Sequence, residues 1–302
     1  MLSLLIKFTK KALLILIMSA MLITGGFNHS SYADYSENEY RKVDVVIRAG
    51  EWQNNTNAKP GKRYIWGNDI SLSQHGLTVK DVPVDIPLRK GEEGFYISEA
   101  DINLKTAKAI AKKLSQKENI DVDLQYSNNS STDLNAAGRI ATFKDPIIYF
   151  SVHHNSWKED SKGYFFITNE DDHKSTIIAQ SLSDSIKDNN LVPQMKNRTN
   201  VDNYIGEINE TAKNGRISIL GELGFFSNPE ELKLIISDEY VDYVSSKLAD
   251  KLYETFKEQQ TINTTNITKE EKQQKVIGIK KKQKIEEVIL DTNDGLKIKL
   301  VY

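Results

Sequence analysis

Two adjacent histidines follow an apolar run in the segment IIYFSVHHNSW. The run from Ile147 to Val152 is short and rich in β-branched and aromatic residues, which predicts a buried strand ending near His153 and His154. In open α/β sheets, ligands gather at the carboxyl ends of strands, where a neutral imidazole can bind a metal ion or transfer a proton. The alternative is that one histidine is a hydrogen-bonded core residue and the other faces water.

Three glutamates occupy comparable positions. Glu51 follows a first predicted strand, Glu222 ends a later one, and Glu99 opens a predicted helix. Because parallel strands bring their carboxyl ends to the same edge of a sheet, we expect these acids and a histidine to converge there. Two or three carboxylates with one imidazole form the donor set of an open zinc site, in which a fourth position is left for water.

Glu222 lies in the apolar segment ILGELGFFSN. Apolar surroundings raise the pKa of a carboxyl group. A carboxylate beside a metal ion, but not bound to it, can take a proton from water and pass it to a leaving nitrogen, so Glu222 suits the role of general base. The alternative is a strand-end glutamate that caps a loop or pairs with Arg139 or Arg198.

The elements that would position these residues alternate along the chain. Strands are predicted at 43–48, 122–127, 147–153, 164–168 and 217–222, and helices at 99–114, 134–143, 174–187, 229–236 and 239–256. Ser98 is the expected N-cap of the first helix. This alternation predicts an α/β fold, a single domain with a mostly parallel central sheet flanked by helices on both faces. Residues 52–97 have no helical period and are expected to form a long excursion that walls the site.

Residues 1–33 differ from the rest of the chain. Three lysines precede the apolar stretch Ala12 to Phe27, and Ser31 and Ala33 are small residues placed before a cut, which is the pattern of a signal peptide. An uncleaved membrane anchor is the alternative, because the apolar stretch is near the shortest length that spans a bilayer. In both cases the remainder of the chain is expected outside the cytoplasm.

Charge and cysteine content exclude several classes of protein. The net charge is −2, and removal of residues 1–33 takes away three positive charges and makes it −5, so nucleic acid is not an expected partner. Cysteine is absent, which excludes a disulfide-stapled fold, a cysteine nucleophile and a thiolate metal site. Metal binding would therefore depend on histidine and carboxylate ligands.

Three segments carry a resemblance to a known family: SEADINLKTAKAIAKKL, IIYFSVHHN and ISILGELGFFSNPEE. In this order and spacing they resemble the zinc-dependent N-acetylmuramoyl-L-alanine amidases, autolysin-type bacterial wall hydrolases, over about Val43 to Phe256. The resemblance implies that Glu99 and His153 bind one Zn²⁺ per chain and that Glu222 is the catalytic base. His153 rather than His154 matches the family pattern, and adjacent strand residues point to opposite faces.

The segment VVIRAGEWQ departs from the family, which has a ligand histidine where this chain has Glu51. A Glu51, Glu99 and His153 set would give zinc two negative ligands and make it a weaker Lewis acid, so reduced activity is expected. The expected reaction is zinc-dependent hydrolysis of the amide between N-acetylmuramic acid and L-alanine in peptidoglycan. The alternatives are a catalytically degenerate homologue that binds wall peptides in a regulatory or structural role, and a metallopeptidase that cuts within the stem peptide.

The chain therefore divides into a signal peptide at 1–33, an amidase-like catalytic domain at 42–257 and a tail at 258–302. In the tail, residues 258–274 are polar and without period, which predicts a linker, and alternating runs around 293–295 predict a β-hairpin. Between them lies a cluster formed by Lys280, Lys281, Lys282 and Lys284. The cluster is either a solvated surface or a contact for anionic wall polymers, in a protein secreted or associated with the cell wall.

Overall fold

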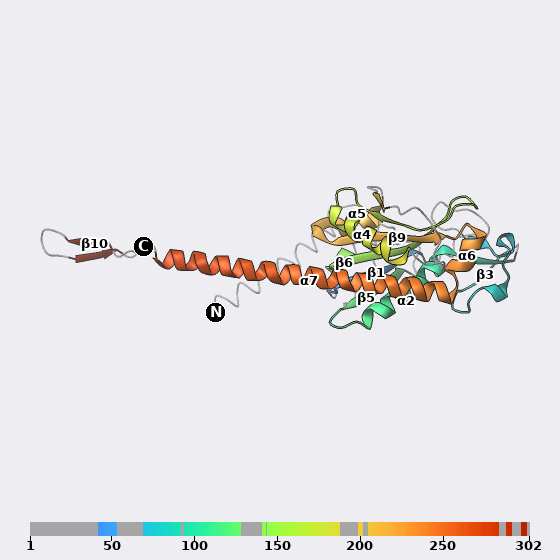
Figure 1. The fold of residues 1–302 in the computed structure, drawn as a ribbon, viewed down its shortest axis with the longest axis horizontal. Coiled ribbons are helices and arrows are strands. Elements are labelled where there is room, and N and C mark those ends of the chain that lie inside the picture. The colour runs from blue at the N-terminus through green and yellow to red at the C-terminus, as the bar shows by residue number, and fades with distance from the viewer. Residues whose placement is uncertain are drawn as a thin grey trace, which may run out of the picture. The chain divides into compact units, whose positions relative to one another are not determined.

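A computed structural model describes residues 42–52, 69–91, 94–127, 141–142, 144–187, 199–201, 205–283, 288–291 and 297–300. Its centre is a six-stranded sheet in the order β5-β1-β6-β9-β7-β8. The strands are β1 (Val45–Trp52), β5 (Val122–Ser127), β6 (Ile148–Asn155), β7 (Phe165–Thr168), β8 (Thr199–Val201) and β9 (Ile217–Phe225). Strand β7 pairs antiparallel with β9, and all other neighbours in this sheet are parallel. The predicted mostly parallel sheet is confirmed, and Figure 1 shows β1, β6 and β9 near its middle.

Alternating side chains of the central strands pack into two hydrophobic clusters, one on each face of the sheet. Val45 and Ile47 of β1 belong to the larger cluster, whereas Val46 between them belongs to the smaller one. The larger cluster includes apolar residues of α2 (Glu99–Ser115), α4 (His173–Ile186), α6 (Pro229–Ile235) and α7 (Asp238–Gln283). The smaller cluster includes Ile208 of α5 (Gly206–Ala212). Helices therefore cover both faces, as predicted.

Part of the excursion between the first strand and the first helix forms a small antiparallel sheet. Its strands are β2 (Asp69–Ser71), β3 (Arg89–Gly91) and β4 (Gly94–Ser98), in the order β2-β4-β3, and short 3₁₀ turns η2 (Ser73–His75) and η3 (Val79–Asp81) follow β2. Strand β4 leads directly into α2, so its pairing with β2 fixes where Glu99 begins the helix. Ser98 occupies the N-cap position with an extended backbone, but its side chain makes no capping hydrogen bond.

The C-terminal part of the chain differs from the sequence prediction. Helix α7 does not end at Phe256 but continues to Gln283, through the segment predicted as a linker. Lys, Glu and Gln are good helix formers, so a polar segment without an apolar stripe can still propagate a helix. Strands β10 (Val288–Asp291) and β11 (Lys297–Leu300) pair antiparallel where the hairpin was predicted.

Several sequence predictions concern residues outside the described part of the chain. The predicted helix at 134–143 is described only at residues 141 and 142, which are helical, and the signal peptide at 1–33 is not described. Among the helices that are described, none has the length and hydropathy needed to cross a membrane.

Candidate metal centre and active site

Glu51, Glu99 and His153 converge at the carboxyl-terminal edge of the sheet. Each offers one ligand atom, and the three atoms lie within 4.8 Å of one another. Nδ1 of His153 is 3.4 Å from Oε1 of Glu99 and 3.9 Å from Oε1 of Glu51. Two carboxylate oxygens and one imidazole nitrogen facing a common point match the donor set of a zinc site with an open position. The structure thus brings together the three predicted ligands, from β1, α2 and β6.

Glu51 reaches this point through an irregularity in β1. The strand does not end at Arg48 as predicted but continues to Trp52, and its register with β5 shifts between these two residues. Glu51 has a φ of 60°, a left-handed conformation that is uncommon for residues other than glycine. Such irregularities re-aim side chains at the edges of sheets, and strained backbone clusters at functional sites.

Gly50 allows the imidazole of His153 to lie against β1. A Cβ atom on residue 50 would be 2.2 Å from Nε2 of His153, far inside any permitted contact. The ring therefore occupies the space that any other side chain would fill. The chain needs glycine at this position because of that close approach.

Asn103 and His154 form a hydrogen-bonded network that holds the side chain of Glu99. Asn103, one turn further along α2, donates from Nδ2 to Oε1 of Glu99 at 3.1 Å. Nδ1 of His154 lies 2.8 Å from Oδ1 of Asn103. Burial, followed by the charge of His153, lowers the pKa of His154 to about 3, so His154 is neutral and donates this bond. His154 thus supports Glu99 and points away from the His153 side of the sheet, as strand alternation predicts.

Glu222 is the register partner of His153 on the neighbouring parallel strand β9. All the remaining residues of β9 are buried, whereas Glu222 is half-buried. Its Oε2 atom has no hydrogen-bond partner among the described residues, and the alternative partners Arg139 and Arg198 lie outside them. Burial raises the pKa of Glu222 to about 8 against the opposing charge of His153. A carboxyl group with one unengaged oxygen beside the three candidate ligands is suited to general acid–base chemistry.

The carboxyl groups of Glu51 and Glu99 are close together and largely buried, which disfavours the state in which both are ionised. Burial, and then the neighbouring charge of Glu99, raise the pKa of Glu51 to about 8. A bound cation would relieve this unfavourable arrangement, because a metal ion is the largest local charge in such a site. The electrostatics of the donor set therefore fit a divalent ion as well as its geometry does.

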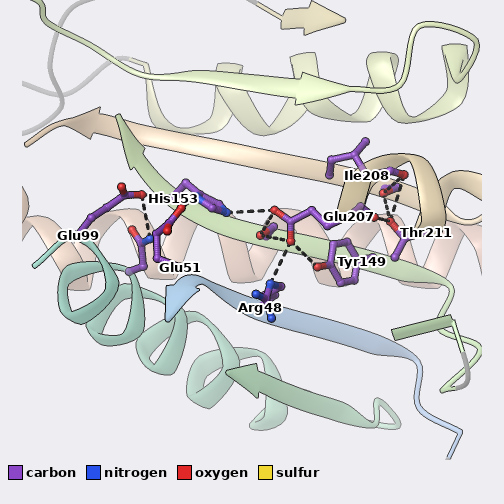
Figure 2. A network of polar contacts seen from close by, with 11 residues as sticks. Arg48, Glu51, Glu99, Tyr149, His153, Glu207, Ile208 and Thr211 are labelled. Atoms are coloured by element: carbon purple, nitrogen blue, oxygen red, sulfur yellow. Dashed lines mark hydrogen bonds and ion pairs between the residues drawn. The ribbon is translucent and has the colours of Figure 1, made fainter. Parts of the chain in front are cut away.

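A fourth acid, Glu207 of α5, was not among the predicted site residues; it is fully buried and lies next to His153. Figure 2 shows His153 between the pair Glu51 and Glu99 on one side and Glu207 on the other. Oε1 of Glu207 is 3.1 Å from Nε2 of His153, and Oε2 is 3.0 Å from Nε of Arg48. Burial opposes ionisation, but the hydrogen bond and charge of His153 and the charge of Arg48 outweigh it and lower the pKa of Glu207 to about 2.

The α/β sheet carries a carboxyl group with an unengaged oxygen next to a cluster of two carboxylates and an imidazole, and this combination is suited to metal-assisted hydrolysis. Residues 75–254 match the N-acetylmuramoyl-L-alanine amidase family, and the chain belongs to this family. The matched segment contains Glu99, His153 and Glu222 and begins after Glu51. Among curated proteins, none matches the chain.

Several solved structures share the fold. An N-acetylmuramoyl-L-alanine amidase from Clostridium difficile 630 has a TM-score of 0.51 and 19% identity, over 71% of this chain and 96% of that chain. The amidase Ami1 from Mycobacterium abscessus has a TM-score of 0.50 and 13% identity, over 70% and 98%. Cwp6 from Clostridium difficile has a TM-score of 0.50 and 16% identity, over 71% and 29%. At these identities the likeness shows the fold, while the family match establishes the enzyme class as amidase.

Proposed function

We propose that this chain is a zinc-dependent amidase that hydrolyses the bond between N-acetylmuramic acid and L-alanine in peptidoglycan. The observation that carries the proposal is the convergence of Glu51, Glu99 and His153 from three separate segments to within 4.8 Å, next to the half-buried Glu222. One zinc ion per chain, when bound, would polarise the substrate carbonyl and acidify a water molecule.

Three of the side chains would bind the zinc ion, and the fourth would transfer protons. Glu51 and Glu99 would hold the ion through Oε1 and His153 through Nδ1, since these are the atoms that face one another. Glu222 is the general base, and its unengaged Oε2 accepts a proton from the attacking water and returns it to the nitrogen of the leaving L-alanine. Burial raises the pKa of Glu222, which favours the protonated form that the second step needs. The positive charge of a bound zinc ion would lower this pKa and so favour the ionised form that the first step needs.

Digestion of purified cell walls tests the reaction. The full mature chain should contain about one zinc per molecule, and it should release new amino termini on L-alanine without freeing reducing sugars. Glu222→Gln keeps the shape of the side chain but removes its basicity, so cleavage should be abolished while zinc remains bound. Glu230→Gln is the matched control, because Glu230 is exposed and pairs only with Lys162 among the described residues. That variant should cut like the wild type.

The outcomes separate the proposed function from its alternatives. Zinc bound without any new amine indicates a degenerate homologue that binds wall peptides. Glu51 is the reason to consider this alternative, because the family has a ligand histidine at its position. New termini at another peptide bond indicate a metallopeptidase. If Glu222→Gln cuts at the wild-type rate, Glu222 is not the base.

We also propose that residues 1–33 direct export and that the chain acts as a secreted or wall-associated protein. Sequencing the exported form should give an amino terminus at Asp34; retention of residues 1–33 would indicate the uncleaved anchor instead. The lysine cluster of the tail, Lys280, Lys281, Lys282 and Lys284, is proposed to contact anionic wall polymers. Changing these four residues to Gln should weaken sedimentation with intact walls but not with walls stripped of those polymers.

A further inference from the structure

Glu207 is a buried acid that the proposed reaction does not use. We propose that Glu207 is a positioning residue: it accepts a hydrogen bond from Nε2 of His153 and thereby presents Nδ1 of the same ring to the metal. Oε1 of Glu207 lies 3.1 Å from Nε2, on the side of the ring opposite to Glu51 and Glu99 (Figure 2). The inference rests on the proposed metal centre and adds a residue that acts through one of its ligands.

The two nitrogens of His153 have different neighbours, and this decides which one carries the proton. An ionised carboxylate can only accept hydrogen bonds, so the ring nitrogen beside Glu207 must donate. In the singly protonated ring that would bind a metal ion, Nδ1 therefore keeps its lone pair, and Nδ1 is the nitrogen that faces Glu51 and Glu99. A carboxylate behind a ligating imidazole fixes the tautomer and the orientation of the ring and raises the basicity of the ligand.

Glu207 is itself held rigidly, which a positioning residue requires. The hydroxyl group of Tyr149 donates to Oε2 at 2.8 Å, the hydroxyl group of Ser151 lies 3.2 Å from both carboxylate oxygens, and Nε of Arg48 forms an ion pair with Oε2 at 3.0 Å. Tyr149, Ser151 and His153 alternate along β6, so all three face α5. A buried carboxylate remains charged only when it is paired in this way.

Arg48 compensates the negative charge of Glu207. Its side chain and that of Glu207 are both almost fully buried, and their opposite charges compensate each other next to the site. Glu207 can therefore act as a charged acceptor for His153 without adding an uncompensated negative charge beneath the candidate ligands Glu51 and Glu99. Arg48 on β1 and Glu207 on α5 are 159 positions apart in the sequence, and the fold alone brings them together.

Zinc affinity of the full chain, measured by competition with a chelating dye, tests the inference. Glu207→Gln should weaken zinc binding by about 10- to 100-fold, the usual cost of losing a partner of a metal-bound histidine. Thr211→Val is the matched structural control. Thr211 is buried on α5, and its hydroxyl group donates to the backbone carbonyl of Glu207 without touching the carboxylate or His153 (Figure 2). Thr211→Val should lower the unfolding temperature of the metal-free chain yet keep wild-type zinc affinity.

Nitrogen NMR of the zinc-loaded chain gives a second readout, which a purely structural role would not change. His153 should carry its proton on Nε2 in the wild type, and that resonance should shift in Glu207→Gln and stay in place in Thr211→Val. If Glu207→Gln does not fold, Arg48→Met/Glu207→Gln removes both members of the buried charge pair, and the same loss of zinc affinity is expected.

The results distinguish the inference from the metal centre on which it rests. If the wild type binds zinc and Glu207→Gln, or the double variant, binds it equally tightly, Glu207 does not position His153 and the metal centre stands. If the wild type binds no zinc, or if His153→Asn leaves zinc binding unchanged, the metal centre itself is wrong and the inference fails with it.

Discussion

At the scale of single residues, Gly50 restricts where the imidazole of His153 can lie in the proposed metal centre. The imidazole of His153 fills the space above its α-carbon, where an added Cβ would be 2.2 Å from Nε2. We therefore expect Gly50→Ala to push the ring away from Glu51 and Glu99 and to lower zinc affinity at least about tenfold, the scale on which misplaced ligands act. Chelator competition measures the change.

A second glycine provides the control for that prediction. Gly215 has a φ of 73° and open space around its α-carbon, so Gly215→Ala adds backbone strain without touching the site. It should cost about 1 kcal/mol of unfolding free energy and leave zinc binding intact. Wild-type zinc affinity in Gly50→Ala would mean that His153 does not lie over β1 when zinc is bound.

In the proposed zinc site, the negative charge of Glu51 makes the ion a weaker Lewis acid. Glu51→His replaces a negative ligand by a neutral one, and histidine tolerates the φ of 60° at this position better than most residues. Cleavage of purified walls at saturating zinc should become faster, on the order of tenfold, which corresponds to about 1.4 kcal/mol of barrier. Glu51→Gln, which keeps size but loses charge, should instead bind zinc more weakly. Unchanged affinity and rate in both variants would place residue 51 outside the metal shell.

Among the elements, the parallel strands were predictable because each contains a short apolar run with β-branched residues. Their carboxyl ends were not predictable, and β1, β6 and β9 all run two to four residues past the predicted ends. Polar site residues interrupt the apolar pattern while the backbone remains paired with its neighbours. The sequence therefore locates Glu51 and Glu222 near the correct edge, but it cannot reveal the bulged backbone that re-aims Glu51.

Helix α5 and its acid Glu207 are the main feature that sequence reasoning missed. The helix has seven residues, its N-cap Ile205 has no polar side chain, and only Ile208 among its apolar residues joins a buried cluster. Its one start signal is an acid in the first turn, which is Glu207 itself, and seven residues are too few to show a helical period. The one available signal lies elsewhere: Arg48 is a charged residue inside a buried strand, and such a residue requires a buried partner of opposite charge.

Another buried acid, Glu231 of α6, is hydrogen-bonded to the backbone at the end of β9. Its carboxyl oxygens accept hydrogen bonds from the backbone N–H groups of Gly163, at 2.6 Å, and Phe225, at 2.7 Å. Burial nevertheless raises the pKa of Glu231 from 4.5 to about 7, against the opposing effect of these two bonds. The folded chain therefore binds the proton of Glu231 more tightly than the unfolded chain does.

The sign of this shift gives a pH dependence. The stabilising contribution of protonated Glu231 is complete below pH 4.5 and is lost as the pH rises to about 7, at no more than about 1.4 kcal/mol per pH unit. Glu231→Gln lacks this titration, so the difference in unfolding free energy between wild type and variant should shrink between pH 4.5 and pH 7. Denaturant unfolding at several pH values measures it. A difference that is constant or grows over that range would show that the backbone hydrogen bonds, rather than burial, control this group.

For the molecule as a whole, the main question is how much of α7 belongs to the folded domain. The helix contributes a set of buried apolar residues to the larger cluster: Tyr240, Val241, Val244, Leu248, Ala249, Leu252 and Phe256. From Lys257 to Ile262 the side chains are exposed or half-buried. Phe256 is therefore the last residue of α7 that joins the core, among those whose side chains are described.

Two truncations divide the helix on either side of that point. A chain that ends at residue 260 keeps all the residues of α7 that are buried in the described part of the helix, and it should retain the unfolding temperature and zinc affinity of the full chain. A chain that ends at Lys247 loses Leu248, Leu252 and Phe256, each at most 2% exposed. Burial of such side chains contributes about 1.5–3 kcal/mol each, so their loss approaches the whole stability of an ordinary domain, and this chain should not fold. Circular dichroism and thermal unfolding distinguish the two. Destabilisation of the chain ending at residue 260 would show that residues 261–302 pack against the domain.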